Sequence, residues 1–116
     1  MLTLARSITA ALALMSASVF AQQDCDYEGS QREMNACAIN DYQQVFATYA
    51  SAYQDRWRKL PEANRKKFVQ ESTYWAGTVR KQCIRASRDT GGDETILFYT
   101  CLQQVIEFRT MRIKNE

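Results

Sequence analysis

The stretch MNACAINDYQQVFATYASAYQDRWRKLP, residues 34–61, decides the fold, because its apolar and aromatic side chains recur at steps of three and four residues. The recurring positions are Met34, Ala38, Tyr42, Val45, Tyr49, Tyr53, Trp57 and Leu60. Their mean step of about 3.7 residues is the period of an α-helix and not that of a strand. Pro61 cannot continue this helix but suits the first turn of another. The stretch therefore predicts one long helix followed directly by a second.

The ends of the predicted helices carry capping signals. Ser30 and Glu33 form an S-x-x-E capping box, which predicts that the first helix begins there. The second helix continues from Pro61 to the glycine pair Gly91–Gly92, which breaks it. Asp93 then caps a third helix that runs to about residue 113.

Apolar stripes mark the faces that these helices bury. In the second helix the stripe is Phe68, Ser72, Trp75, Val79 and Cys83, and in the third it is Leu97, Cys101, Val105 and Phe108. The aromatic members of these stripes are expected to form the core. Because no alternating strand pattern occurs and the connections are short, we expect an all-α fold. The predicted architecture is a small antiparallel three-helix bundle, a long helical hairpin plus a third helix.

The first twenty-one residues have the pattern of an export signal. A short start with one cation, Arg6, precedes an uncharged apolar stretch, and Ala21 ends a small-residue cleavage site. The sequence therefore predicts a signal peptide over residues 1–21 and a periplasmic or secreted domain over residues 22–116. The apolar stretch is too short for a bilayer, which needs about 20 apolar residues, and no later segment in the mature part has that length and apolarity.

All four cysteines lie in the predicted mature part: Cys25, Cys37, Cys83 and Cys101. An even number in an oxidising compartment predicts two structural disulfides. A metal site is not favoured, because the chain has no histidine and the cysteine gaps do not resemble a zinc knuckle. A redox pair is not favoured either, since no Cys-x-x-Cys occurs.

The pairing of the cysteines stays open at this stage. Counted from the two turns, Cys37, Cys83 and Cys101 fall at nearly the same level of the bundle, which supports bridges between them. The same coincidence leaves all three connectivities possible. Sequential pairing, Cys25 with Cys37 and Cys83 with Cys101, is preferred here.

The net charge and the residue types present disfavour two classes of protein, nucleic-acid-binding proteins and enzymes. Without Arg6 the domain has 14 basic and 13 acidic residues, so its net charge of +1 does not favour a nucleic-acid-binding protein. Without histidine, a serine-nucleophile motif or a marked carboxylate pair, we expect no enzyme, no metal and no cofactor.

The segment RWRKLPEANRKK, residues 56–67, concentrates positive charge at the turn between the first two helices. Its basic residues are Arg56, Arg58, Lys59, Arg65, Lys66 and Lys67. Such a segment is either a solvated hairpin turn or a patch that contacts anions, including anionic wall or membrane material or the acidic cleft of a partner.

Taken with their neighbours, the cysteines resemble those of the LprI-like lysozyme-inhibitor domain family of exported bacterial helical domains. In that family a cysteine precedes a Ser/Thr-x-x-Glu helix start, with a second cysteine four residues after the glutamate. A tryptophan then precedes the third cysteine by eight residues, and a Cys-Leu pair precedes an arginine. The matching residues are Cys25, Ser30, Glu33, Cys37, Trp75, Cys83, Cys101, Leu102 and Arg109.

Three positions depart from this family pattern. Val79-Arg80 stands where Arg-Asp is common, and Ile106 stands where a threonine is common. The resemblance implies an exported protein that binds lysozyme and inhibits it by covering the substrate cleft, without catalysis. The alternative from a different class is an envelope component that contacts anionic wall or membrane material through residues 56–67.

Overall fold

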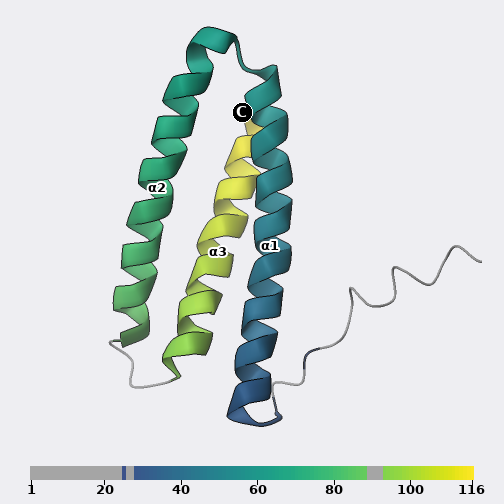
Figure 1. The fold of residues 1–116 in the computed structure, drawn as a ribbon, viewed down its shortest axis with the longest axis vertical. Coiled ribbons are helices and arrows are strands. Elements are labelled where there is room, and N and C mark those ends of the chain that lie inside the picture. Colours follow the sequence, from purple (N-terminus) through teal and green to yellow (C-terminus); the bar gives the residue numbers. More distant parts are fainter. Residues whose placement is uncertain (1–24, 26–27, 89–92) are drawn as a thin grey trace, which may run out of the picture.

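The computed structural model describes Cys25, residues 28–88 and residues 93–116. These residues form three α-helices, α1 (Gln31–Lys59), α2 (Glu62–Arg88) and α3 (Glu94–Asn115). Consecutive helices run in opposite directions (Figure 1), which confirms the predicted all-α antiparallel bundle. The predicted signal peptide, residues 1–21, and the predicted break at Gly91–Gly92 lie outside the described residues.

The predicted caps begin two of the helices. Ser30 Oγ accepts a hydrogen bond from the backbone N–H of Glu33 at 3.3 Å, and the Glu33 carboxylate folds back over Gly29. Asp93 Oδ1 accepts from the backbone N–H groups of Thr95 and Ile96 at 3.0 and 3.5 Å. These oxygens satisfy backbone donors that a helix N-terminus otherwise leaves unpaired.

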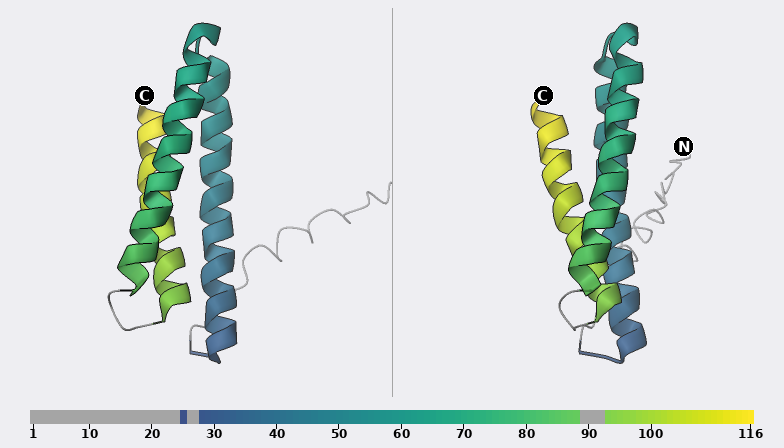
Figure 2. Two further views of the ribbon diagram at one scale, coloured as in Figure 1. Left: turned by 60° about the vertical axis from the view of Figure 1, so that its left-hand side comes forward. Right: turned by 90° about the vertical axis from the view of Figure 1, so that its left-hand side faces the viewer.

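Helix α3 packs against both other helices, on one side of the α1–α2 hairpin (Figure 2). Between α1 and α2 the contact is made largely by rings: Tyr53 stacks on Phe68 with centroids 4.8 Å apart, and Tyr49 lies 5.6 Å from Trp75. Because these rings are large, they hold the backbones of α1 and α2 apart. The third helix is therefore the element that joins the other two.

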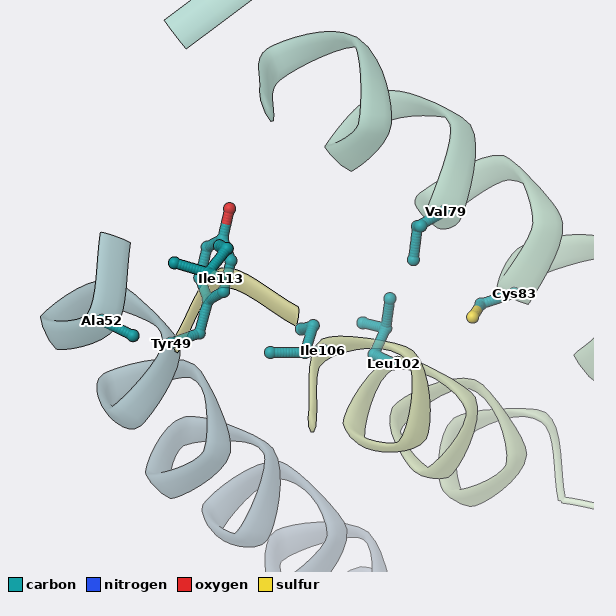
Figure 3. Close-up of a cluster of buried hydrophobic side chains, with 7 residues drawn as sticks. All are labelled: Tyr49, Ala52, Val79, Cys83, Leu102, Ile106 and Ile113. Atoms are coloured by element: carbon teal, nitrogen blue, oxygen red, sulfur yellow. The ribbon is translucent and has the colours of Figure 1, made fainter. Parts of the chain in front are cut away.

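All three helices contribute to the core. Its buried apolar side chains are Tyr49, Ala52, Val79, Cys83, Leu102, Ile106 and Ile113 (Figure 3). The predicted aromatic core is partly correct. Tyr42, Tyr53 and Trp75 pack against the cluster, whereas Trp57 is 38% exposed.

The stripe predicted for the third helix is displaced from the buried face. The buried residues of α3 are Leu102, Ile106, Thr110 and Ile113, whereas Phe108 is 64% exposed. The prediction centred the stripe on Cys101, which faces α2. Because α3 packs against α1 as well, its buried face is turned toward the space between the two neighbours.

A disulfide between Cys83 and Cys101 joins α2 to α3, with the Cα atoms 5.6 Å apart. Cys83 is completely buried within the core cluster. This bridge confirms one half of the sequential pairing. Cys25 lies near the buried Cys37 of α1, and a bond between them stays a prediction.

Replacing Cys83 and Cys101 together by alanine is expected to lower the free energy of unfolding by about 3 kcal/mol, because the bridge restricts the unfolded chain across 18 residues of sequence. Urea unfolding followed by circular dichroism measures the loss. The matched control replaces Cys25 and Cys37, whose predicted bond would close a shorter loop, so we expect a smaller loss. An unchanged urea midpoint in the Cys83/Cys101 variant would contradict the structural role of the bridge.

Candidate functional site

The hairpin tip, defined here as residues 57–67, projects beyond the end of α3. Arg56 Nη1 donates a hydrogen bond to the backbone oxygen of Glu116 at 2.9 Å, so the last residue of the chain lies level with Arg56. Past this level, α1 and α2 are the helices of the described residues that continue (Figure 1). A narrow projection of this kind has the shape needed to enter a cleft in a partner.

Positive charge is concentrated in the hairpin tip. It holds five basic side chains and one acidic side chain, although the predicted mature chain has a net charge of only +1. The basic residues are Arg58, Lys59, Arg65, Lys66 and Lys67. The positive potential is therefore a local property of this end of the molecule, and it attracts anions at short range.

Arg65 holds the hairpin turn together. Its Nε donates to the backbone oxygen of Trp57 at 3.0 Å, and its Nη2 donates to that of Arg58 at 3.2 Å. The guanidinium also lies 4.1 Å from the centroid of the Trp57 ring. Arg65 thus donates to two carbonyl groups at the C-terminus of α1, where the Trp57 carbonyl also accepts from the backbone N–H of Leu60 at 3.3 Å. The positive charge of Arg65 also interacts favourably with the negative end of the helix dipole.

The other tip cations face solvent. Arg58 lies 3.6 Å from Asp55, and Lys67 lies 3.8 Å from Glu71, in exposed ion pairs that contribute little to stability. Within the described part of the chain, Lys59 and Lys66 have no carboxylate within 4.0 Å. Of the six basic residues predicted as a patch, Arg58, Lys59, Lys66 and Lys67 are therefore available to a partner, whereas Arg56 and Arg65 make contacts within the fold.

An apolar hollow of about 280 Å³ lies beside the hairpin tip. It is lined by Tyr53, Gln54, Trp57, Arg58 and Val69. Trp57 is 38% exposed and Val69 is 40% exposed, so both offer apolar surface next to the cations. The sequence prediction missed Val69, which directly follows Phe68 of the apolar stripe of α2. An apolar residue next to such a stripe, on the face turned to solvent, is a signal that could have indicated a contact surface.

The residues shared with the family pattern have structural roles. Ser30 and Glu33 begin α1, as described above, and Trp75 and Arg109 meet inside the bundle. The Arg109 guanidinium lies 5.3 Å from the centroid of the Trp75 ring. Because the buried Arg109 Nε has no hydrogen-bond acceptor among the described residues, the ring face is an important stabilising contact for this cation.

Tyr49 completes this cluster from α1. Burial raises its pKa above the ordinary value of 10.0, and the positive charge of Arg109 opposes the shift. The neighbouring Tyr53 raises the pKa further. Tyr49, Trp75 and Arg109 come from three different helices, so their contacts fix how the helices are arranged.

Of the three residues that depart from the family pattern, Val79 and Ile106 lie inside the bundle, whereas Arg80 is exposed. Val79 is 5% exposed and Ile106 is 6% exposed, and both belong to the core cluster. This chain therefore fills with apolar side chains two positions where the resemblance leads us to expect polar residues.

The described residues show no grouping of side chains suited to metal binding. They contain no cluster of three or more side chains of the metal-binding types. None of their helices combines the length and apolarity needed to cross a membrane. What these residues do present is a rigid helical surface with a cationic end, which is suited to binding.

A small disulfide-linked helical binding domain is the class of protein that this fold and site define. The family model described as "Lysozyme inhibitor LprI" matches residues 21–112, which include every cysteine and every other motif residue discussed above. The chain belongs to this family, whose description is that of an inhibitor. No curated protein and no solved structure matches the chain.

Arg65→Ala is expected to lower the free energy of unfolding by about 1–2 kcal/mol, because it removes two hydrogen bonds and a cation–π contact. Thermal unfolding measures the effect. Lys66→Ala removes the same charge from the neighbouring residue and serves as the control. Equal stability of the two variants would contradict the capping role of Arg65.

Tyr49→Phe is expected to make the protein less sensitive to alkaline pH. The pKa of Tyr49 is higher in the folded chain than in the unfolded chain. The protonated hydroxyl therefore contributes fully to the free energy of unfolding below pH 10.0, and this contribution is lost as the pH rises through the pKa of the folded chain. Urea unfolding at about pH 9 and at about pH 11 should show that the free energy of unfolding falls less between these two pH values in the variant than in the wild type. An equal fall in the free energy of unfolding in the variant and the wild type would contradict the burial of this hydroxyl.

Proposed function

We propose that the protein inhibits lysozyme by inserting the hairpin tip into the substrate cleft of the enzyme. Membership of the family supports inhibition of lysozyme. The observation that carries the assignment to the tip is its form, a cationic projection of α1 and α2 that extends past the end of α3.

Electrostatics favours this site of contact. Lysozyme hydrolyses its glycan with two carboxyl groups that flank the bond to be cleaved. A cleft lined by one sign of charge focuses its potential, and a cation that enters it forms charge-assisted hydrogen bonds with the carboxylates. Arg58, Lys59 and Lys66 are the exposed tip cations suited to this role.

Rigidity and apolar contact add to the affinity. The tip is held in one conformation by Arg65, so little conformational entropy is lost when it binds. Trp57 and Val69 supply exposed apolar surface beside the cations, where a few well-packed residues carry most of the energy of an interface. Inhibition then follows from occlusion, and no chemical step is needed.

Export accords with this function. The Cys83–Cys101 disulfide suits an oxidising compartment, and the predicted signal peptide would deliver the chain to the periplasm or the exterior, where lysozyme acts. The alternative, an envelope component that contacts anionic material through residues 56–67, stays a prediction that requires its own binding measurement.

The test is the rate at which lysozyme lyses cell walls in the presence of the purified mature protein. The tip variant carries Arg58→Gln, Lys59→Gln and Lys66→Gln, and the control variant removes three exposed cations outside the tip, Arg32→Gln, Arg80→Gln and Arg112→Gln. We expect the inhibitory concentration of the tip variant to rise about tenfold or more, a loss of about 1.4 kcal/mol, and that of the control to change less than twofold.

Two results would count against the proposal. An unchanged lysis rate at micromolar wild-type protein would remove the inhibitory function itself. Equal losses in the tip and control variants would remove the assignment to the hairpin tip while leaving inhibition in place.

A further inference from the structure

Gly77 lies in the middle of α2, and no contact within the described fold requires a glycine there. Glycine is among the least favourable residues in a helix interior. A Cβ built at Gly77 meets no other atom within 4 Å, so neither packing nor close approach of another helix requires its absence. The residue is exposed, and what it creates is a gap in the side chains on the surface of α2.

Cationic and aromatic side chains surround this gap. Tyr74 is 79% exposed, and Lys81 and Arg88 follow it at intervals of seven residues. Seven residues are close to two turns of helix, so these three side chains lie along one line of α2, over about 21 Å. Arg85 lies on the same side, one turn after Lys81. The α2 outer face is defined here as Tyr74, Gly77, Lys81, Arg85 and Arg88.

Positive charge predominates on the α2 outer face. Helix α2 holds seven basic and two acidic residues, in a predicted mature chain of net charge +1. Among residues 28–88 and 93–116, no carboxylate lies within 4.0 Å of the charged groups of Lys81, Arg85 or Arg88. These three side chains and Ile84 line a hollow of about 400 Å³.

We propose that the α2 outer face binds a linear anionic glycan, which lies along α2 from Tyr74 to Arg88. The cations form a line, and a line of charge fits an extended polymer better than a compact anion. The exposed Tyr74 ring offers a flat apolar face to a sugar ring, and the gap at Gly77 lets the chain approach the helix backbone. Lysine and arginine then pair with the acidic groups of the glycan.

Other anionic partners fit this surface less well. A partner helix would need an apolar seam to pack against, and Tyr74 is the one large apolar side chain among the five residues of the face. An anionic bilayer would be attracted by the cations, but it gains nothing from a missing side chain at Gly77.

The charged part of this surface lies toward the end of α2 opposite the hairpin tip (Figure 1). Both surfaces are therefore available at once. A protein held on an anionic glycan through α2 keeps its hairpin tip free, and attachment raises its local concentration at the wall material on which lysozyme acts. Glycan binding itself does not depend on the proposed inhibition.

The experiment measures binding of the mature protein to heparin, a linear sulfated glycan, at low and high salt. Lys81→Gln with Arg85→Gln and Arg88→Gln is expected to weaken binding tenfold or more and to reduce its salt dependence. The hairpin-tip variant, with Arg58→Gln, Lys59→Gln and Lys66→Gln, removes the same number of cations and should weaken binding less than threefold.

Gly77→Gln gives the sharpest result, because its two effects have opposite signs. The substitution is expected to raise the Tm by about 3 °C or more, since glutamine favours a helix, and to weaken heparin binding about fivefold by closing the gap. Wild-type binding by this variant would overturn the proposal, as would equal losses in the two triple variants. Association with phosphatidylglycerol vesicles but not with heparin would also overturn it, in favour of a membrane surface.

Discussion

The buried disulfide between Cys83 and Cys101 is the constraint on which the arrangement of the helices depends. Helices α1 and α2 meet mainly through aromatic rings, so their direct contact does not define a close backbone approach. Helix α3 packs against both of them, and the disulfide fastens it to α2 at the level of the core. The position of α2, and with it the direction of the hairpin tip, follows from this link.

The aromatic contacts between α1 and α2 also bear on the hairpin tip. Rings such as Tyr53 and Phe68 hold α1 and α2 together beside α3, and the same two helices continue past the end of α3 as the hairpin tip. Arg65 supports this tip by capping α1 and covering Trp57. The part of the molecule that is free to contact a partner is thus stabilised by its own side chains.

The residues of the family pattern and the proposed contact surfaces lie in different parts of this molecule. The residues that carry the family pattern, including Trp75 and Arg109, lie within the scaffold and hold the helices together. The side chains available to a partner lie on the hairpin tip and on the α2 outer face, outside that pattern. A sequence pattern of this kind therefore identifies the scaffold more directly than the contact surface.

The helical period, the capping residues and Pro61 are local signals, and they were sufficient to predict three antiparallel helices with nearly the observed ends. The basic segment was equally visible in the sequence. Only the tertiary structure showed that Arg65 donates hydrogen bonds within the fold and that α3 buries Ile106 instead of Phe108. The reason is that the helical period places residues around one axis, whereas burial and pairing depend on where the neighbouring helices lie.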